Sequence, residues 1–189
     1  MKLLLNDERV DINKVDNDGN SPFYLACYYG HIDIVKLLLN EKRTQVNTIN
    51  DNGETPFYTT CKNGKIEILK VLLNDPRVNI NEVNASKHNR TPLHVSCLQG
   101  EIQVVKYILA SGRDVSLSEK DEEGKTAINI AREGWKFIEI KRDWERRKRN
   151  CIKIVELMES FERNPNETRF KLRIQLGLTG NNYFLFLSF

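Results

Sequence analysis

TPLHVSCLQG, from Thr91 to Gly100, is the stretch that decides the fold of this chain. It opens with a hydroxyl residue that can cap a helix and with a proline suited to the first helical position, and it ends in glycine. The pattern also occurs at SPFYLACYYG (Ser21 to Gly30), TPFYTTCKNG (Thr55 to Gly64) and, in part, TAINIAREG (Thr126 to Gly134). The four hydroxyl residues lie 34, 36 and 35 positions apart, and repetition at this period predicts a solenoid of stacked repeats.

A second apolar segment follows the first helix in three of the repeats. In IDIVKLLLN, IEILKVLLN and IQVVKYILA the apolar residues recur at helical spacing on one face, so each segment predicts a second helix. A glycine precedes the cap in most repeats, as in Asp18-Gly19, and it predicts a turn there because glycine accepts a positive φ without steric cost. In the third repeat Asn89 takes the place of this glycine. The three second helices are expected to begin at Ile32, Ile66 and Ile102.

This unit of a finger-like turn and two helices resembles the ankyrin repeat. The family pattern D-x-x-G-x-T-P-L-H-x-A, followed by G-H-x-x-I-V-x-L-L-L, is matched closely by Thr91 to His94 and by Gly30 to Leu39. The resemblance covers about residues 2–131 and resumes at Ile152 to Met158. It implies an all-α ankyrin-repeat solenoid of helix-turn-helix units with finger loops. It also implies a non-catalytic module that binds other proteins through its concave face.

The two ends of the array depart from this regular pattern. The stretch from Lys2 to Asn6, KLLLN, is repeated 34 positions later at Lys36 to Asn40. The chain is therefore expected to open within the second helix of a repeat. Such an end lacks the polar cap that a solenoid needs, which indicates a fragment of a longer protein or an end covered by another chain. We predict an array over residues 1–160, divided into a partial repeat (1–15), repeats at 16–50, 51–86 and 87–120 and a last repeat (121–160), and then a C-terminal segment (161–189).

The last repeat contains an insertion, WKFIEIKRDWERRKR, at residues 135–149. Its helix formers, and acid–base pairs four residues apart such as Glu145 and Arg149, predict a basic helical hairpin. In one interpretation Trp135, Ile138 and Trp144 pack on the last repeat while the charges face water. In the other, the hairpin recognises nucleic acid or an acidic partner such as a calmodulin-like protein. The candidate basic site, which also resembles a short nuclear-localisation cluster, is Arg146, Arg147, Lys148 and Arg149.

Charge is distributed unevenly along the chain. Residues 132–173 hold 13 Lys or Arg against 8 Asp or Glu, whereas the rest of the chain holds 16 against 18. The repeats therefore present no continuous phosphate-binding stripe, and nucleic acid is an unlikely ligand for them. Polar residues follow the N-terminal MKLLL at once, which excludes the apolar stretch of a signal peptide. We expect a protein without membrane association that resides in the cytoplasm, with the nucleus as the alternative.

The C-terminal segment is predicted to cover the last repeat. Asn164-Pro165 ends a helix, and the apolar residues from Phe170 to Leu178 can belong to a capping helix. Their alternation equally suits a strand, although Lys171 and Arg173 favour the helix. The apolar tail at residues 181–189 is too short to span a bilayer. Three interpretations of it stay open: packing on the cap, an aggregation-prone edge, or an out-of-frame or truncated gene end.

No residue set predicts catalysis or metal binding. Cys27, Cys61 and Cys97 occupy one slot in successive helices, and packed helices lie about 8–10 Å apart, too far for these thiols to share a zinc ion or a disulfide. We expect them, and Cys151 beside the last apolar stripe, to be core residues. His94 is expected to be structural. We therefore predict a protein that is not an enzyme and has no cofactor and no metal site.

The resemblance also implies where a partner protein would bind, at the finger tips and the exposed ends of the first helices. The pair Tyr28 and Tyr29 is the strongest candidate, because tyrosine combines apolar area with a hydrogen-bonding tip, although either ring can instead cover a neighbouring helix. The candidate contact residues are Asn17, Asp18, Asn20, Tyr28, Tyr29, Asp51, Asn52, Glu54, Lys62, Asn63, Lys87, His88, Arg90, Leu98, Gln99, Glu122, Glu123 and Lys125.

Overall fold

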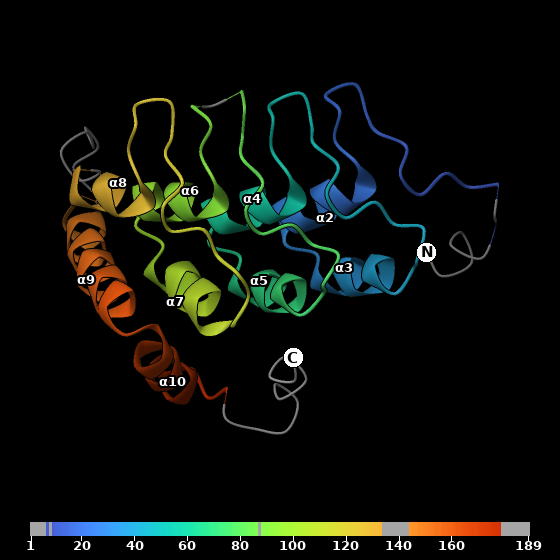
Figure 1. Cartoon of the computed structure of the whole chain (residues 1–189). Helices are drawn as coiled ribbons and strands as arrows, with labels where there is room; N and C mark the ends of the chain where they lie inside the picture. Colours follow the sequence, from blue (N-terminus) through green and yellow to red (C-terminus); the bar gives the residue numbers. More distant parts are fainter. Residues whose placement is uncertain (1–6, 8, 87, 134–143, 179–189) are drawn as a thin grey trace.

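The chain folds as two layers of short helices with a row of loops on one side (Figure 1). The computed structural model describes residues 7, 9–86, 88–133 and 144–178, and in this part of the chain the only β-type pairing is an isolated bridge between Asn84 and Arg90. The expected partial helix at Lys2 to Asn6 lies outside the described residues. The helices are α2 (Pro22–Tyr29), α3 (Ile32–Leu39), α4 (Pro56–Lys62), α5 (Ile66–Leu73), α6 (Pro92–Gln99), α7 (Ile102–Ala110), α8 (Ala127–Glu133), α9 (Trp144–Arg163) and α10 (Pro165–Gln175).

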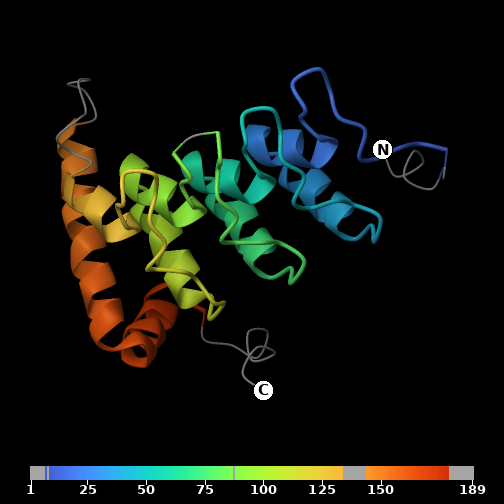
Figure 2. The same ribbon diagram turned by 45° about the horizontal axis from the view of Figure 1, so that its top comes forward.

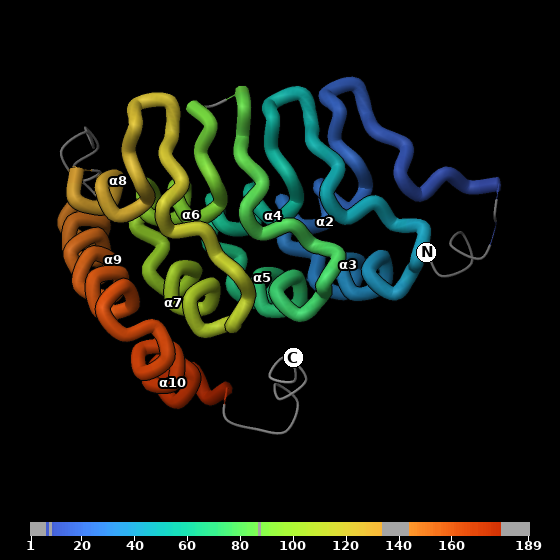
Figure 3. The backbone as a smooth tube through the Cα atoms, viewed as in Figure 1, coloured from blue at the N-terminus to red at the C-terminus, as the bar shows by residue number. Residues whose placement is uncertain are grey.

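The inner layer consists of α2, α4, α6 and α8, each packed on the next, and the outer layer of α3, α5 and α7 lies beneath it (Figure 1). Seen after the 45° turn of Figure 2, the helix pairs follow one another as a stack, and α9 runs along the end of the stack. The tube in Figure 3 shows the finger loops standing in a row beside the inner layer. This arrangement confirms the predicted all-α solenoid.

Hydroxyl caps start the inner helices as predicted. The side-chain oxygens of Ser21 and Thr55 accept hydrogen bonds from the backbone N–H of Tyr24 (3.1 Å) and Tyr58 (3.0 Å). Thr91 accepts from the backbone N–H of His94 (3.3 Å), and proline occupies the first turn of each of these three helices. Each cap satisfies a backbone donor that the first turn of a helix leaves free.

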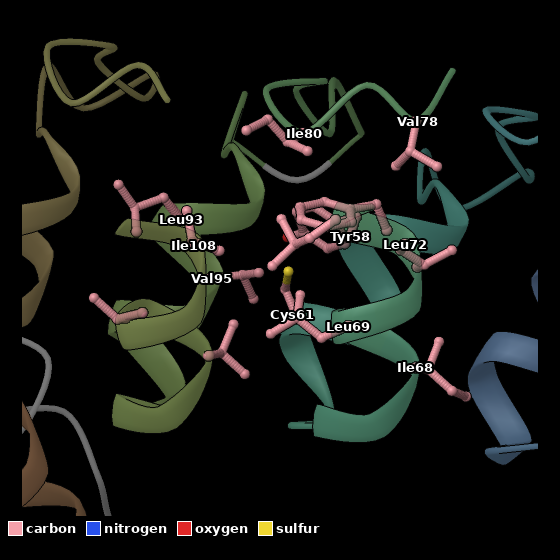
Figure 4. Close-up of a cluster of buried hydrophobic side chains, with 14 of the residues drawn as sticks. Tyr58, Cys61, Ile68, Leu69, Leu72, Val78, Ile80, Leu93, Val95 and Ile108 are labelled. Atoms are coloured by element: carbon pink, nitrogen blue, oxygen red, sulfur yellow. The ribbon is translucent and has the colours of Figure 1, made fainter. Parts of the chain in front are cut away.

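The core is a ribbon shared between neighbouring repeats. Figure 4 shows part of it, where Tyr58 and Cys61 of α4 lie beside Val95 of α6. Cys27, Cys61 and Cys97 are each 0% exposed, so the three equivalent thiols are core residues, and burial raises their pKa values. Cys151 is also buried, with its sulfur 3.7 Å from the carbonyl oxygen of Cys97.

Side-chain turns build the fingers. In the first finger the Asp16 side chain accepts the backbone N–H groups two and four residues on, and Asn50 and Asp121 do the same in the second and fourth fingers. The third finger is longer than the others. Its closing hydrogen bond runs from the backbone N–H of Asn84 to the carbonyl of Arg90, six positions on, whereas the equivalent bond in the other fingers spans four positions. Asn89 has a φ of 51°, as predicted for the glycine position of this finger.

The helices α9 and α10 cover the last regular repeat. α9 is continuous over 20 residues, so the final residues of the predicted insertion extend this helix, while residues 135–143, with Trp135 and Ile138, lie outside the described part. The segment after Pro165 is helical to Gln175, which decides between the helix and the strand predicted from its pattern. Arg173 donates through Nε to the carbonyl of Ala110 (3.0 Å) at the C-terminus of α7. The tail at residues 179–189 also lies outside the described residues.

Candidate functional site

A hollow of about 420 Å³ opens between the first two fingers and the helices α2 and α4. We call it the tyrosine hollow. It brings together seven of the residues predicted as partner contacts, which come from two different repeats. Three further residues, Tyr24, Leu25 and Asn50, complete its wall. The predicted contacts that line it are Asp18, Asn20, Tyr28, Tyr29, Asn52, Glu54 and Lys62.

Three tyrosine rings of α2 form a step along one side of the hollow. The rings of Tyr24 and Tyr28 are stacked with their centroids 6.2 Å apart, and Tyr29 meets Tyr28 edge-on at 5.1 Å. Tyr24 is buried, whereas Tyr28 and Tyr29 are 44% and 63% exposed. Stacked and edge-on geometries are the preferred arrangements of aromatic pairs, so the rings hold each other in place. The predicted tyrosine pair is thus exposed and fixed.

A hydrogen-bonded floor closes the hollow between the two repeats. The Tyr24 hydroxyl donates to Oε2 of Glu54 at 2.8 Å, and the Lys62 ammonium donates to Oε1 of the same carboxylate at 2.8 Å. Beside them, Nδ2 of Asn50 donates to Oδ1 of Asn20 at 2.8 Å. Burial, followed by the neighbouring Glu54, raises the pKa of Tyr24 to about 12, so this phenol stays protonated at neutral pH.

Glu54 differs from what its finger position suggests. It was predicted as an exposed contact, but the residue is only 4% exposed and lies under the hollow, where it holds Tyr24 and Lys62. Tyr24 and Asn50 also line the hollow, and pattern reasoning did not include them among the candidate contacts. The signal for Tyr24 was present, because it occupies the third helical position, from which His94 also reaches the next finger.

The third and fourth fingers are joined by ion pairs. Arg90 of the third finger lies 3.3 Å from the carboxylate of Asp121 and 3.7 Å from that of Glu123, both in the fourth finger. The predicted contacts in these fingers are therefore already engaged with one another. Lys87 lies outside the described residues, whereas Asn17, Asp51 and Asn63 are exposed around the first two fingers and α4.

The comparison with known families identifies the fold. The family described as ankyrin repeats (3 copies) matches residues 1–84 and 42–119. The chain belongs to the ankyrin repeat family. No curated protein matches it. Ankyrin repeats are generally protein–protein interaction modules and are typically non-catalytic.

The basic cluster at the end of the ankyrin array does not form one surface. Arg147 donates through Nε to the backbone carbonyl of Gln99 at 3.1 Å and also contacts the Gln99 side chain. The Lys148 ammonium lies 4.6 Å from the ring centroid of Trp144, and Arg149 lies 3.9 Å from Glu145. Successive helical residues point in different directions, so only part of the cluster faces outward. Gln99, a predicted contact, is partly covered by this arginine.

His94 is a structural residue of the ankyrin array. Its Nδ1 accepts the backbone N–H of Thr91 at 3.2 Å, so Nε2 must carry the hydrogen that is donated to the Lys125 carbonyl at 3.0 Å. Burial lowers the pKa of this imidazole, which favours the neutral form. Within the described ranges, no group of three or more His, Cys, Asp or Glu residues could hold a metal ion. Among the described helices, none is long and apolar enough to cross a membrane.

Proposed function

We propose that this chain is a non-catalytic adaptor or scaffold that binds a partner protein through the concave face formed by the fingers and the inner helices, with the tyrosine hollow at the centre of the interface. The observation that carries the proposal is the exposed pair Tyr28 and Tyr29 at the mouth of the hollow. Tyrosines of this kind often dominate the energy of protein interfaces.

The pair distinguishes the first repeat from its neighbours. At the positions that correspond to Tyr28, the next two repeats carry Lys62 and Leu98. The tyrosine rings are also held in stacked and edge-on contacts before any partner arrives. Less side-chain entropy is lost when groups that are already ordered enter an interface, so this arrangement favours binding.

The experiment that tests the proposal is affinity capture with the purified full chain and a double variant, Tyr28→Ala with Tyr29→Ala. Phe170→Ala is the matched control, because Phe170 on α10 is 63% exposed, as much as Tyr29, and lies away from the hollow. We expect the tyrosine variant to lose specific partners that the wild-type chain and the control both retain. Retention of every partner by the tyrosine variant would contradict the proposal.

The alternative, binding of nucleic acid or an acidic partner through the basic insertion at residues 135–149, has weaker support. Arg147 is engaged with Gln99 of the array, so it serves the packing of α9. Neutralisation of Arg146, Lys148 and Arg149 to glutamine leaves that contact in place. We expect this triple variant to capture the same partners as the wild-type chain, whereas a loss restricted to it would favour the alternative.

A further inference from the structure

The concave face changes its charge from one repeat to the next. The finger and inner helix of the first two repeats (residues 16–30 and 50–64) carry Asp16, Asp18, Asp51 and Glu54 against a single cation, Lys62, which is four negative charges and one positive charge, or −3. The corresponding stretch of the third repeat, residues 84–100, carries two cations and no carboxylate. The fourth repeat is acidic as well, since residues 121–134 carry four carboxylates against two cations, or −2. There, however, Asp121 is paired with Arg90, and Glu123 and Glu133 are paired with Lys125.

The one cation of the hollow is already neutralised by a neighbour. The Lys62 ammonium lies 2.8 Å from the Glu54 carboxylate, which also accepts the Tyr24 hydroxyl. Asp18, in contrast, is an exposed residue on the wall of the hollow, and no hydrogen bond or ion pair joins its carboxylate to another described residue. An acidic group therefore faces the opening, together with the half-exposed ring of Tyr28.

Resting on the proposed function, we propose that the tyrosine hollow receives an arginine side chain of the partner protein, with the guanidinium against the ring of Tyr28 and paired with the carboxylate of Asp18. Aromatic faces attract cations, and the planar guanidinium both stacks on such a face and donates a pair of hydrogen bonds to a carboxylate. Lysine offers only a point charge to this geometry. Phosphate groups are repelled by the net charge of −3.

The arrangement of the hollow supports this occupant in a second way. The stacked pair of Tyr24 and Tyr28 presents a rigid aromatic wall, because Tyr24 is buried and its hydroxyl is fixed on Glu54. Asn52 also lines the hollow, and its amide oxygen can accept a guanidinium N–H, whereas the amide oxygen of Asn20 already accepts from Asn50. The hollow is therefore lined by a carboxylate, a further oxygen acceptor and an aromatic ring, which are the groups that a guanidinium binds.

The test uses the full ¹⁵N-labelled chain, titrated with N-acetyl-arginine methylamide and followed by two-dimensional NMR. The matched probes are the citrulline derivative, which has the same shape without the charge, and the lysine derivative. We expect saturable shifts at the amides of Asp18, Tyr28 and Asn52, with binding of the citrulline derivative weaker by about tenfold or more. Asp18→Asn and Tyr28→Leu should each weaken arginine binding by about fivefold or more, since each removes one half of the recognition. Asp114→Asn, which alters an exposed carboxylate after α7, should leave it unchanged.

Several results would overturn the proposal. They are the absence of shifts at the hollow, shifts spread equally over the exposed carboxylates of the array, or equal binding of the arginine derivative and either of its two matched probes. The spectrum of each variant reports at once whether it is folded. If arginine fails but partner capture still depends on Tyr28 and Tyr29, the proposed function stands and only the identity of the bound group is wrong. If capture is also independent of the tyrosines, both proposals fail.

Discussion

At the scale of the residue, the glycine at a fixed place in each finger affects how closely neighbouring fingers can approach. Gly53 and Gly124 occupy the same place in the second and fourth fingers, with φ values of 74° and 73°. A methyl group at Gly53 would lie 2.4 Å from Oδ1 of Asn84, whereas nothing lies within 4 Å of the same position at Gly124. Both glycines have a positive φ, but only Gly53 lies close to side chains of a neighbouring finger.

These two glycines yield a prediction on stability. Gly53→Ala and Gly124→Ala should both lower the free energy of unfolding by about 1 kcal/mol, because alanine strains a positive φ. Gly53→Ala should cost measurably more, since the side chains of Asn84 and Ser86 in the third finger must also move. Urea denaturation of both variants checks this expectation, and equal losses would mean that the fingers do not pack as closely as the geometry indicates.

His94 yields a prediction on pH. Its pKa is lowered by burial from an ordinary value of 6.5, so the unfolded chain binds a proton more readily than the folded chain. The neutral imidazole therefore contributes stability above about pH 6.5 that is lost as the pH falls below this value. His94→Asn removes this titration and can keep the cap, because Asn129 accepts the backbone N–H of Thr126 in the equivalent position. We expect the variant to lose stability less steeply between pH 7 and pH 5, and an unchanged slope in urea titrations would exclude His94 as the source.

At the scale of the element, the helix α10 works as a cap for the outer layer. The last carbonyl groups of a helix have no partner within it, and Arg173 donates to those of Ala110 and, at 3.4 Å, Ser111 after α7. Arg169 donates from the previous turn of α10 to the Leu109 carbonyl at 3.4 Å. The arginines of α10 therefore both satisfy these carbonyls and complement the negative end of the α7 dipole.

The capping role of α10 can be measured by substitution. Arg173→Met keeps the apolar stem but removes the donors, and we expect it to lower the free energy of unfolding by about 1.5 kcal/mol, within the range for hydrogen bonds from charged groups. Lys171→Met is the matched control. Lys171 is exposed and pairs only with Glu167 on the surface of the same helix, so its loss should cost little. Equal effects in thermal or urea denaturation would show that α10 does not cap α7.

At the scale of the whole molecule, stability should be graded along the stack. Each repeat contacts only its neighbours, so the central repeats are supported on both sides and the first described pair, α2 and α3, on one side by described helices. We expect amide hydrogen exchange to be slowest in α4, α5, α6 and α7 and faster in α2 and α3. Uniform protection along the chain would indicate that the array opens only as a single cooperative unit.

The sequence by itself determined the repeat unit, its caps, the cysteine slot and the positive φ of Asn89. These features depend on residues within one repeat, where backbone geometry and helical periodicity act over a few positions. Seven of the predicted contacts do line one hollow, because equivalent positions in stacked repeats come to lie side by side. The family pattern was therefore enough to place the fingers and the inner helices, though their role in binding stays a proposal.

Only the tertiary structure decided which of those residues are open to a partner. Glu54 lies buried and accepts a hydrogen bond from the hydroxyl of Tyr24, 30 positions earlier. Gln99 is partly covered by Arg147, 48 positions later. Such contacts depend on how closely two repeats stack and on the course of α9 after an irregular insertion, and no local propensity encodes either. Contacts between repeats also make the two halves of the concave face different. An ion pair joins the third and fourth fingers, while the tyrosine hollow is open between the first and the second.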